Sequence, residues 1–164
     1  MKKLLVAVAV TLFPFAAFGA PADKDEPKGD KVEFSVHDGY FESNKSGLKG
    51  DASFLAFNDQ EAFNKTFGMA VVMGKKRNFL PKDAFDTKIV AAVIKRGNAI
   101  TEYKVEKVTA DGKTLYVQYR AKEQAGGGTA TYASPLIVSV DKGKITSVVF
   151  IEGDKKVGTA EFGK

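Results

Sequence analysis

Short runs of apolar residues, typical of strands, begin at position 32 of this chain. Val32, Phe34 and Val36 alternate with polar residues, which is the two-residue period of a half-buried strand. Residues 53–57 form a second short run that predicts a strand. Residues 89–94 are apolar throughout, and a run of six without a polar face predicts a central strand that is covered on both sides.

One segment, residues 58–68, has a helical period instead. Asn58 is the predicted N-cap, because a short polar side chain there can accept a hydrogen bond from the first helical turn. Phe63 and Phe67 are four positions apart and therefore share one face of the helix. Gly68 is a typical residue just beyond a helix C-terminus, so we expect the helix to end there.

The second half of the chain has the pattern of a C-terminal β-meander. Residues 101–108 are predicted to pair with 114–121 across an Asp-Gly turn, which is among the strongest hairpin signals. Residues 129–140 are predicted to pair with 145–151, and 145–151 with 156–162, across turns that also contain glycine. With one short α-helix, this pattern predicts a mainly β fold, either an antiparallel β-sandwich or an open barrel.

Three details refine this expectation. Pro135 lies inside the predicted strand 129–140 and implies a bulge, a break or an edge position, because proline donates no hydrogen bond. The lysine-rich strand 156–162 is typical of an edge guarded by charge, and a partner's strand could add to such an edge. Residues 74–87 are predicted to form a long loop with at most one helical turn, at 81–84.

The first twenty residues differ from the rest, and we predict that they are a secretory signal peptide. Two lysines precede an apolar run over residues 4–18, and small residues follow it. The run is shorter than the roughly 20 residues that a membrane-spanning helix needs. We expect cleavage near Ala20, a solvated arm over 21–30 and a single β-rich domain over 31–164. The protein is then exported, to a periplasm or to the cell exterior, without a stable membrane anchor.

Composition excludes several kinds of site. The 164 residues include no cysteine, which rules out disulfides, thiolate zinc sites, iron–sulfur clusters and cysteine nucleophiles. The single histidine rules out a metal site built on two histidines. Removal of the signal peptide takes away two lysines and no acid, so the formal charge falls from +5 to +3. That charge is too small to indicate nucleic-acid binding.

No pattern for catalysis, for a cofactor or for a metal stands out, and we expect the protein not to be an enzyme. A Ser–His–Asp triad would need His37, but the neighbouring Asp38 points to the opposite face of the strand. His37 falls on the polar face, where a surface or loop-packing role is expected, and no Gly-x-Ser-x-Gly motif is present. The three glycines at 126–128 resemble a phosphate-binding loop, but a strand and not a helix follows them.

Loop aromatics and a short basic run are the candidates for binding a partner. The aromatic residues lie in or beside loops, where core packing does not explain them. The basic run suits an acidic partner or an anionic surface, although such runs are more often solvated loops. The candidate partner-binding residues are Tyr40, Phe41, Lys75, Lys76, Arg77, Phe79 and Phe85.

From residue 54 to residue 152 the order of features resembles the PrcB C-terminal family, which is named for a subunit of a protease complex. The shared features are a strand and short helix, a proline and an aromatic before an apolar strand ending in glycine, a tyrosine-containing strand, a strand with an internal proline and a last apolar strand. They lie at residues 54–57, 60–63, Pro81, Phe85, 89–97, 102–108, 131–138 and 148–150. The chain departs from the family at Glu102, where glycine is common, and in having no cysteine for lipid attachment.

The resemblance implies an exported, non-catalytic accessory module that binds or stabilises a protein partner, with a protease complex as one candidate. Two alternatives stay open. One is a protease inhibitor that acts through loops on the same scaffold. The other is a carboxylate-dependent hydrolase or a carbohydrate-binding module, because paired acids cannot be recognised from their positions in the sequence.

Overall fold

The computed structural model describes residues 27–70, 74, 76–125 and 130–162. The predicted signal peptide, the first part of the predicted arm and the glycine run at 126–128 lie outside these residues. Strands dominate the described chain, and the predicted mainly β, sandwich-like fold is confirmed.

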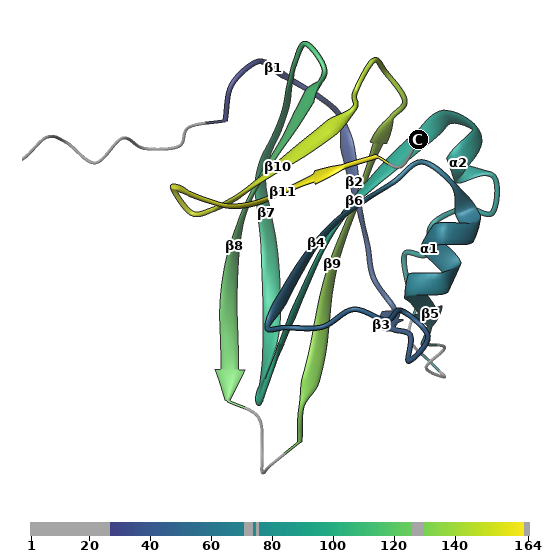
Figure 1. The fold of residues 1–164 in the computed structure, drawn as a ribbon, viewed down its shortest axis with the longest axis vertical. Coiled ribbons are helices and arrows are strands. Elements are labelled where there is room, and N and C mark those ends of the chain that lie inside the picture. The colour runs from purple at the N-terminus through teal and green to yellow at the C-terminus, as the bar shows by residue number, and fades with distance from the viewer. Residues whose placement is uncertain (1–26, 71–73, 75, 126–129, 163–164) are drawn as a thin grey trace, which may run out of the picture.

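Two large sheets form the first two layers of the fold (Figure 1). The five-stranded sheet has the order β1-β7-β8-β10-β11, with β1 (Asp30–Lys31), β7 (Ala99–Asp111), β8 (Thr114–Ala125), β10 (Ser147–Glu152) and β11 (Lys155–Glu161). The four-stranded sheet has the order β2-β9-β6-β4, with β2 (Phe34–His37), β9 (Tyr132–Asp141), β6 (Lys88–Gly97) and β4 (Ala52–Phe57).

A third layer covers the outer face of the four-stranded sheet, on the right of Figure 1. Its elements are the paired strands β3 (Tyr40–Glu42) and β5 (Phe67–Met69) and the helices α1 (Gln60–Thr66) and α2 (Ala84–Thr87). The sequence predicts one helix and at most one further helical turn at 81–84; the described residues contain two helices, the second of them at Ala84–Thr87. The predicted cap is wrong by one residue, because Asp59 and not Asn58 accepts the amide of Ala62 (Oδ1–N 2.8 Å). α1 ends before Phe67, since the chain there enters β5, so Gly68 is not the helix stop.

β6 lies between two hydrophobic cores, as its unbroken apolar run predicts. Successive side chains of a strand point to opposite faces, so one strand can supply both cores. The residues of β6 in the core between the two large sheets are Ile89, Ala91 and Val93. Those in the core under the helices are Val90, Ala92 and Ile94. All six are at most 5% exposed, and β6 therefore joins the three layers.

The predicted hairpin between residues 129–140 and 145–151 is wrong, whereas the other two hairpins are confirmed. β7 pairs with β8 and β10 pairs with β11, both antiparallel. β9 already has β2 on one side and β6 on the other, so no edge is left for β10. The chain instead crosses to the other sheet after β9, where β10 lies parallel to β8.

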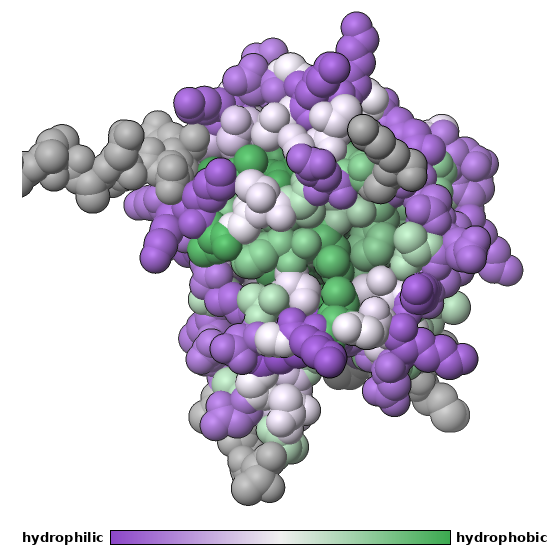
Figure 2. Space-filling view, viewed as in Figure 1, coloured by the Kyte–Doolittle hydropathy of each residue, from purple (hydrophilic) through white to green (hydrophobic). Residues whose placement is uncertain are grey.

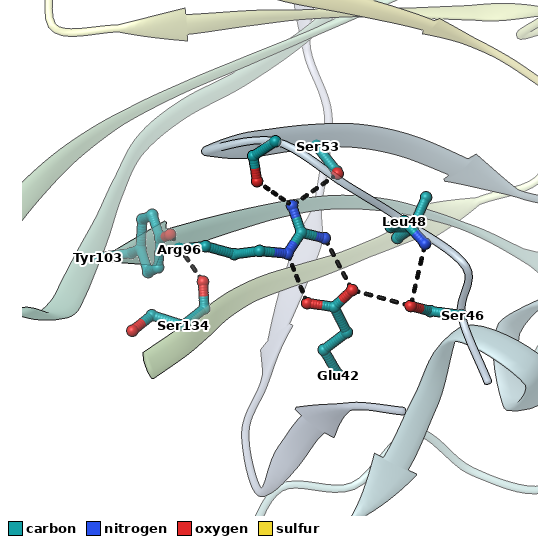
Figure 3. Close-up of polar contacts among 8 residues, drawn as sticks. Glu42, Ser46, Leu48, Ser53, Arg96, Tyr103 and Ser134 are labelled. Atoms are coloured by element: carbon teal, nitrogen blue, oxygen red, sulfur yellow. Dashed lines mark hydrogen bonds and ion pairs between the residues drawn. The ribbon is translucent and has the colours of Figure 1, made fainter. Parts of the chain in front are cut away.

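A half-buried ion pair connects the third layer to the four-stranded sheet (Figure 3). Arg96 of β6 donates two hydrogen bonds to Glu42 of β3, from Nε to Oε2 (2.7 Å) and from Nη2 to Oε1 (2.8 Å). Its Nη1 donates to the Gly50 carbonyl and to the Ser53 hydroxyl, each at 3.0 Å. Ser46 also donates to Glu42, and these bonds, above all those from Arg96, lower the pKa of Glu42. The loop between β3 and β4 is thereby fixed to the sheet.

The two-sided burial of β6 can be tested by truncating one of its side chains. Ile94 is 0% exposed, so Ile94→Ala should lower the free energy of unfolding by about 2–5 kcal/mol through lost burial and a cavity. Ile100→Ala is the matched control, because Ile100 is 45% exposed, and it should change stability by less than about 0.5 kcal/mol. Urea unfolding of both variants measures the difference, and equal effects would contradict this description of the core.

Candidate functional site

The open edges of the two large sheets are the natural places to look for a site in a fold of this kind. An edge strand exposes backbone donors and acceptors that can pair with another chain unless something covers them. In this structure the edges are formed by β2 and β4 in one sheet, and by β11 and β7 with its short neighbour β1 in the other.

Asn78 covers the outer edge of β2. Its side-chain amide donates to the Val36 carbonyl (Nδ2–O 2.6 Å), and its own carbonyl accepts from the Asp38 amide (3.2 Å). The Asp38 carboxylate in turn accepts a hydrogen bond from the backbone amide of Asn78 (2.5 Å), and this bond lowers the pKa of Asp38. The Val36 carbonyl and the Asp38 amide, at the C-terminal end of this edge, are therefore already paired within the chain.

β4 and β11 lie side by side, each at the edge of its own sheet. The Phe54 ring lies against Gly158, where an added Cβ would come within 2.3 Å of the ring. Phe54, Val157 and Ala160 also pack against the core between the sheets. Figure 2 shows hydrophobic residues in the middle of the face on which Figure 1 shows β4, β10 and β11, with hydrophilic residues around them. The prediction that residues 156–162 include an edge strand is confirmed, but this edge packs against β4.

β7 is a long strand whose backbone, on one of its two sides, is largely unpaired by the other described strands. Over its whole length it pairs with β8, but on its other side β1 pairs only with Thr109 and Ala110. The Val32 amide adds one bond, to the Val108 carbonyl (3.1 Å). From residue 99 to residue 107 no described strand forms a backbone pair with the outer side of β7, although Ser134 of β9 approaches this side at Thr101 and Tyr103. The open stretch ends at a bulge between Val105 and Lys107, where the pairing with β8 shifts.

A groove of about 470 Å³ runs beside the open stretch of β7, and we call it the β7 groove. Its volume lies within the roughly 300–1,000 Å³ that is typical of binding pockets. It is lined by Val36, His37, Asp38, Gly39, Tyr40, Arg77, Thr101, Glu102, Tyr103, Pro135, Leu136 and Ile137. The groove thus lies between the β7 edge, the end of β2 and the part of β9 that β2 no longer covers.

The floor of the β7 groove is fixed by Ser134 and Pro135 of β9. The Ser134 hydroxyl accepts from the Thr101 amide (2.9 Å), and its carbonyl accepts from the Tyr103 hydroxyl (2.8 Å). Burial raises the pKa of Tyr103, so its hydroxyl keeps its proton and remains a donor. The last β2–β9 pair is His37 with Ile137, and Pro135 therefore pairs with β6 alone. This confirms the prediction of an edge position at Pro135.

His37 is buried, so of the two predicted roles, at the surface or packed against a loop, the structure has the second. Its Nδ1–H donates to the Asn78 carbonyl (3.2 Å), and Nε2 then accepts from the Ser139 hydroxyl (2.8 Å). The burial comes from a distant part of the chain, because the 76–80 segment covers the polar face of β2 at this sheet edge. Ser139 is 0% exposed, so the Ser139–His37 pair holds β2 to β9 and offers no nucleophile to a substrate. Asp38 does not take part and instead accepts from Arg77 (Nη1–Oδ2 3.3 Å), in line with its predicted opposite direction.

Of the predicted partner-binding residues, Tyr40, Arg77 and Phe79 come together beside the groove. The Tyr40 and Phe79 rings are edge to face at 5.5 Å, and the Tyr40 hydroxyl accepts from the Leu80 amide (2.9 Å). Arg77 packs with Phe79 around Gly39, whose positive φ (81°) leaves no room for a Cβ. Tyr40 and Arg77 line the β7 groove, so part of the predicted set does lie at a concave surface.

The other predicted residues lie elsewhere. Phe85 is 7% exposed in α2, with its ring 5.7 Å from that of Phe63, so it belongs to the second core and not to a binding surface. Phe41 is 48% exposed and covers Gly68 on the β3–β5 pair. Lys76 is exposed, and Lys75 lies outside the described residues. Sequence reasoning missed the β7 side of the groove, because nothing in an alternating strand shows which of its edges stays unpaired.

Comparisons with known proteins leave the family open. A scan against protein-family models finds no matching family, and searches of curated proteins and of solved structures find no match. Within the described residues, no helix is long and apolar enough to cross a membrane, and no three His, Asp or Glu side chains gather as a metal site requires. The resemblance to the PrcB C-terminal family therefore remains a hypothesis from the sequence.

Burial of His37 predicts a dependence of stability on pH. Desolvation lowers the pKa of His37 below its ordinary value, Lys88 lowers it further, and the Asn78 carbonyl and Asp38 act in the opposite direction. The stabilisation is therefore full above about pH 6.5, the pKa of an unfolded histidine, and is lost as pH falls below that value. Between pH 7 and pH 5 the wild-type free energy of unfolding should fall more steeply than that of His37→Gln, by up to about 1.4 kcal/mol per pH unit. If the free energy of unfolding depends on pH in the same way for the two proteins, the pKa of His37 is the same in the folded and the unfolded state, which would contradict this prediction.

Proposed function

We propose that this chain is an exported, non-catalytic accessory module that binds or stabilises a protein partner, with a protease complex as the leading candidate. The observation that carries the proposal is the β7 groove, where a long strand edge borders a concave surface on the same side of the molecule. Of the other described edges, the C-terminal end of β2 is covered by Asn78, and β4 and β11 pack against each other. An edge left open in this way is a recurrent means of protein recognition.

The groups around the groove support binding more than hydrolysis. A general acid needs a carboxyl group whose pKa is raised toward neutrality. The pKa of Asp38 is lowered instead, first by the Asn78 amide and then by Arg77. The Ser139–His37 pair is closed to solvent, and the Tyr103 hydroxyl is already donating to Ser134. These groups hold the walls of the groove in place.

The resemblance to PrcB supports the same class of function. Its tyrosine-containing segment, 102–108, lies in β7, and its proline-containing segment, 131–138, lies in β9. Both therefore border the β7 groove. Glu102, where the PrcB family commonly has glycine, also lines the groove, so this chain would present a different edge from proteins of that family.

Capture from the native source tests this proposal. Tagged protein, expressed at native level and recovered from the envelope and the medium, should repeatedly bring down one partner in stoichiometric amount. The control is an unrelated exported protein with the same tag. If the partner is a protease, its activity and half-life with and without this protein separate an accessory role from inhibition, since an inhibitor lowers the activity. Repeated recovery of no stoichiometric partner would contradict the proposal.

A further inference from the structure

We infer that the partner contributes an extended peptide segment, which adds to β7 beside residues 101–105 and places one carboxylate against Arg77. The inference rests on the proposed function and specifies its mode of binding. It follows from the direction of the backbone groups of β7, from the state of the other sheet edges and from the unused donors of Arg77.

The outward backbone groups of β7 follow a regular alternation; Thr101 and Tyr103 border the β7 groove, and Val105 continues the same strand edge just beyond the groove lining. The Thr101 amide donates to Ser134 in β9 and therefore points away from β8. The register between β7 and β8 is unbroken from Thr101 to Val105, so the amides and carbonyls of Tyr103 and Val105 point the same way. No described strand pairs with them there. An extended polypeptide is the ligand whose own amides and carbonyls match this spacing.

The ends of the open stretch limit where such a segment can lie. At one end, the Thr101 amide already donates to the Ser134 hydroxyl. At the other end, the bulge follows Val105, and beyond it the Val108 carbonyl accepts from the Val32 amide. A peptide therefore gains its bonds from the groups of Tyr103 and Val105, between these two points. Specificity has to come from side chains, because the backbone bonds are the same for every sequence.

Arg77 supplies a charged group for that specificity. Among the described residues, its guanidinium makes one hydrogen bond, a long one from Nη1 to the Asp38 carboxylate (3.3 Å), and its buried Nε has no partner. The Asp38 carboxylate also accepts from the backbone amide of Asn78, so it keeps a hydrogen-bond partner when Arg77 binds a second carboxylate. A guanidinium with unused donors on a groove wall suits a carboxylate, which it can bind in a bidentate manner. Glu102 on the β7 wall makes the groove unfavourable for a run of acids, so the fit is for a single carboxylate.

A peptide selection tests the inference without knowledge of the partner. The probe is a library of random decapeptides displayed on phage, selected on the purified protein, and the best binder is synthesised for affinity measurement. We expect enriched peptides of β-forming residues with one Glu or Asp at a fixed position. Replacing that acid by its amide should weaken binding to the wild type by about tenfold. Arg77→Gln should bind both peptides equally weakly.

Two further variants separate backbone pairing from side-chain contact. Val105→Pro removes the outward amide without touching a bond to β8, and it should weaken peptide binding by about tenfold. Val105→Thr keeps both the amide and the branched shape and should retain most of the affinity. N-methylation of the peptide at alternate positions should abolish binding at one parity and not at the other, which is a readout that does not depend on the stability of a variant.

The outcomes are distinct. Enrichment of no peptide, equal binding by Val105→Pro and Val105→Thr, or an N-methylation profile without alternation overturns the strand-addition mode. An equal preference for acid and amide peptides overturns the role of Arg77. A dimer of this protein that Val105→Pro disrupts would mean that a second copy occupies the edge, which also overturns the inference. Capture of the native partner by Val105→Pro as well as by the wild type would leave the proposed function intact while the binding mode fails.

Discussion

The burial of both faces of β6 is the constraint on which the rest of the structure depends. Three of its apolar side chains lie in the core between the sheets and three lie in the core under the helices. Burial of this kind stabilises the fold by roughly 25 cal/mol per Å² of apolar surface. Removing the layer on either face of β6 would therefore expose apolar side chains of β6 and lower the stability of the whole fold. Arg96, at the end of the same strand, adds the polar connection to Glu42 and the loop before β4. One strand thus sets the place of all three layers.

The position of β6 also determines which sheet edges remain open. With β6 in the interior of its sheet, β9 and β4 fill its two sides, and β10 has to pair elsewhere. β2 completes the sheet but stops at His37, where Asn78 covers its edge and the Ser139–His37 pair holds it to β9. On the opposite sheet β1 covers only one end of β7. The β7 groove is what remains between these two incomplete edges.

Much of the fold could be predicted from the sequence, because its signals are local. The apolar run at 89–94, the Asp-Gly hairpin and the edge position of Pro135 each follow from a few neighbouring residues. The second hairpin was predicted wrongly, because the competition of β2, β6 and β10 for β9 is a long-range matter. Phe85 was misplaced and the burial of His37 was left open for the same reason, since the segments that bury them come from distant parts of the chain. Of the candidate site, Tyr40 and Arg77 were predicted but the β7 wall was not.

The most direct test of this account is amide hydrogen exchange of β7 in the free protein, followed by NMR. If the edge is open, the outward amides of Tyr103 and Val105 should exchange much faster than the amide of Lys104, which points toward β8. The Thr101 amide, held by Ser134, serves as an internal reference for a protected outward group. Equal and strong protection of Tyr103, Lys104 and Val105 would show that the edge is already covered, and it would contradict a binding site there.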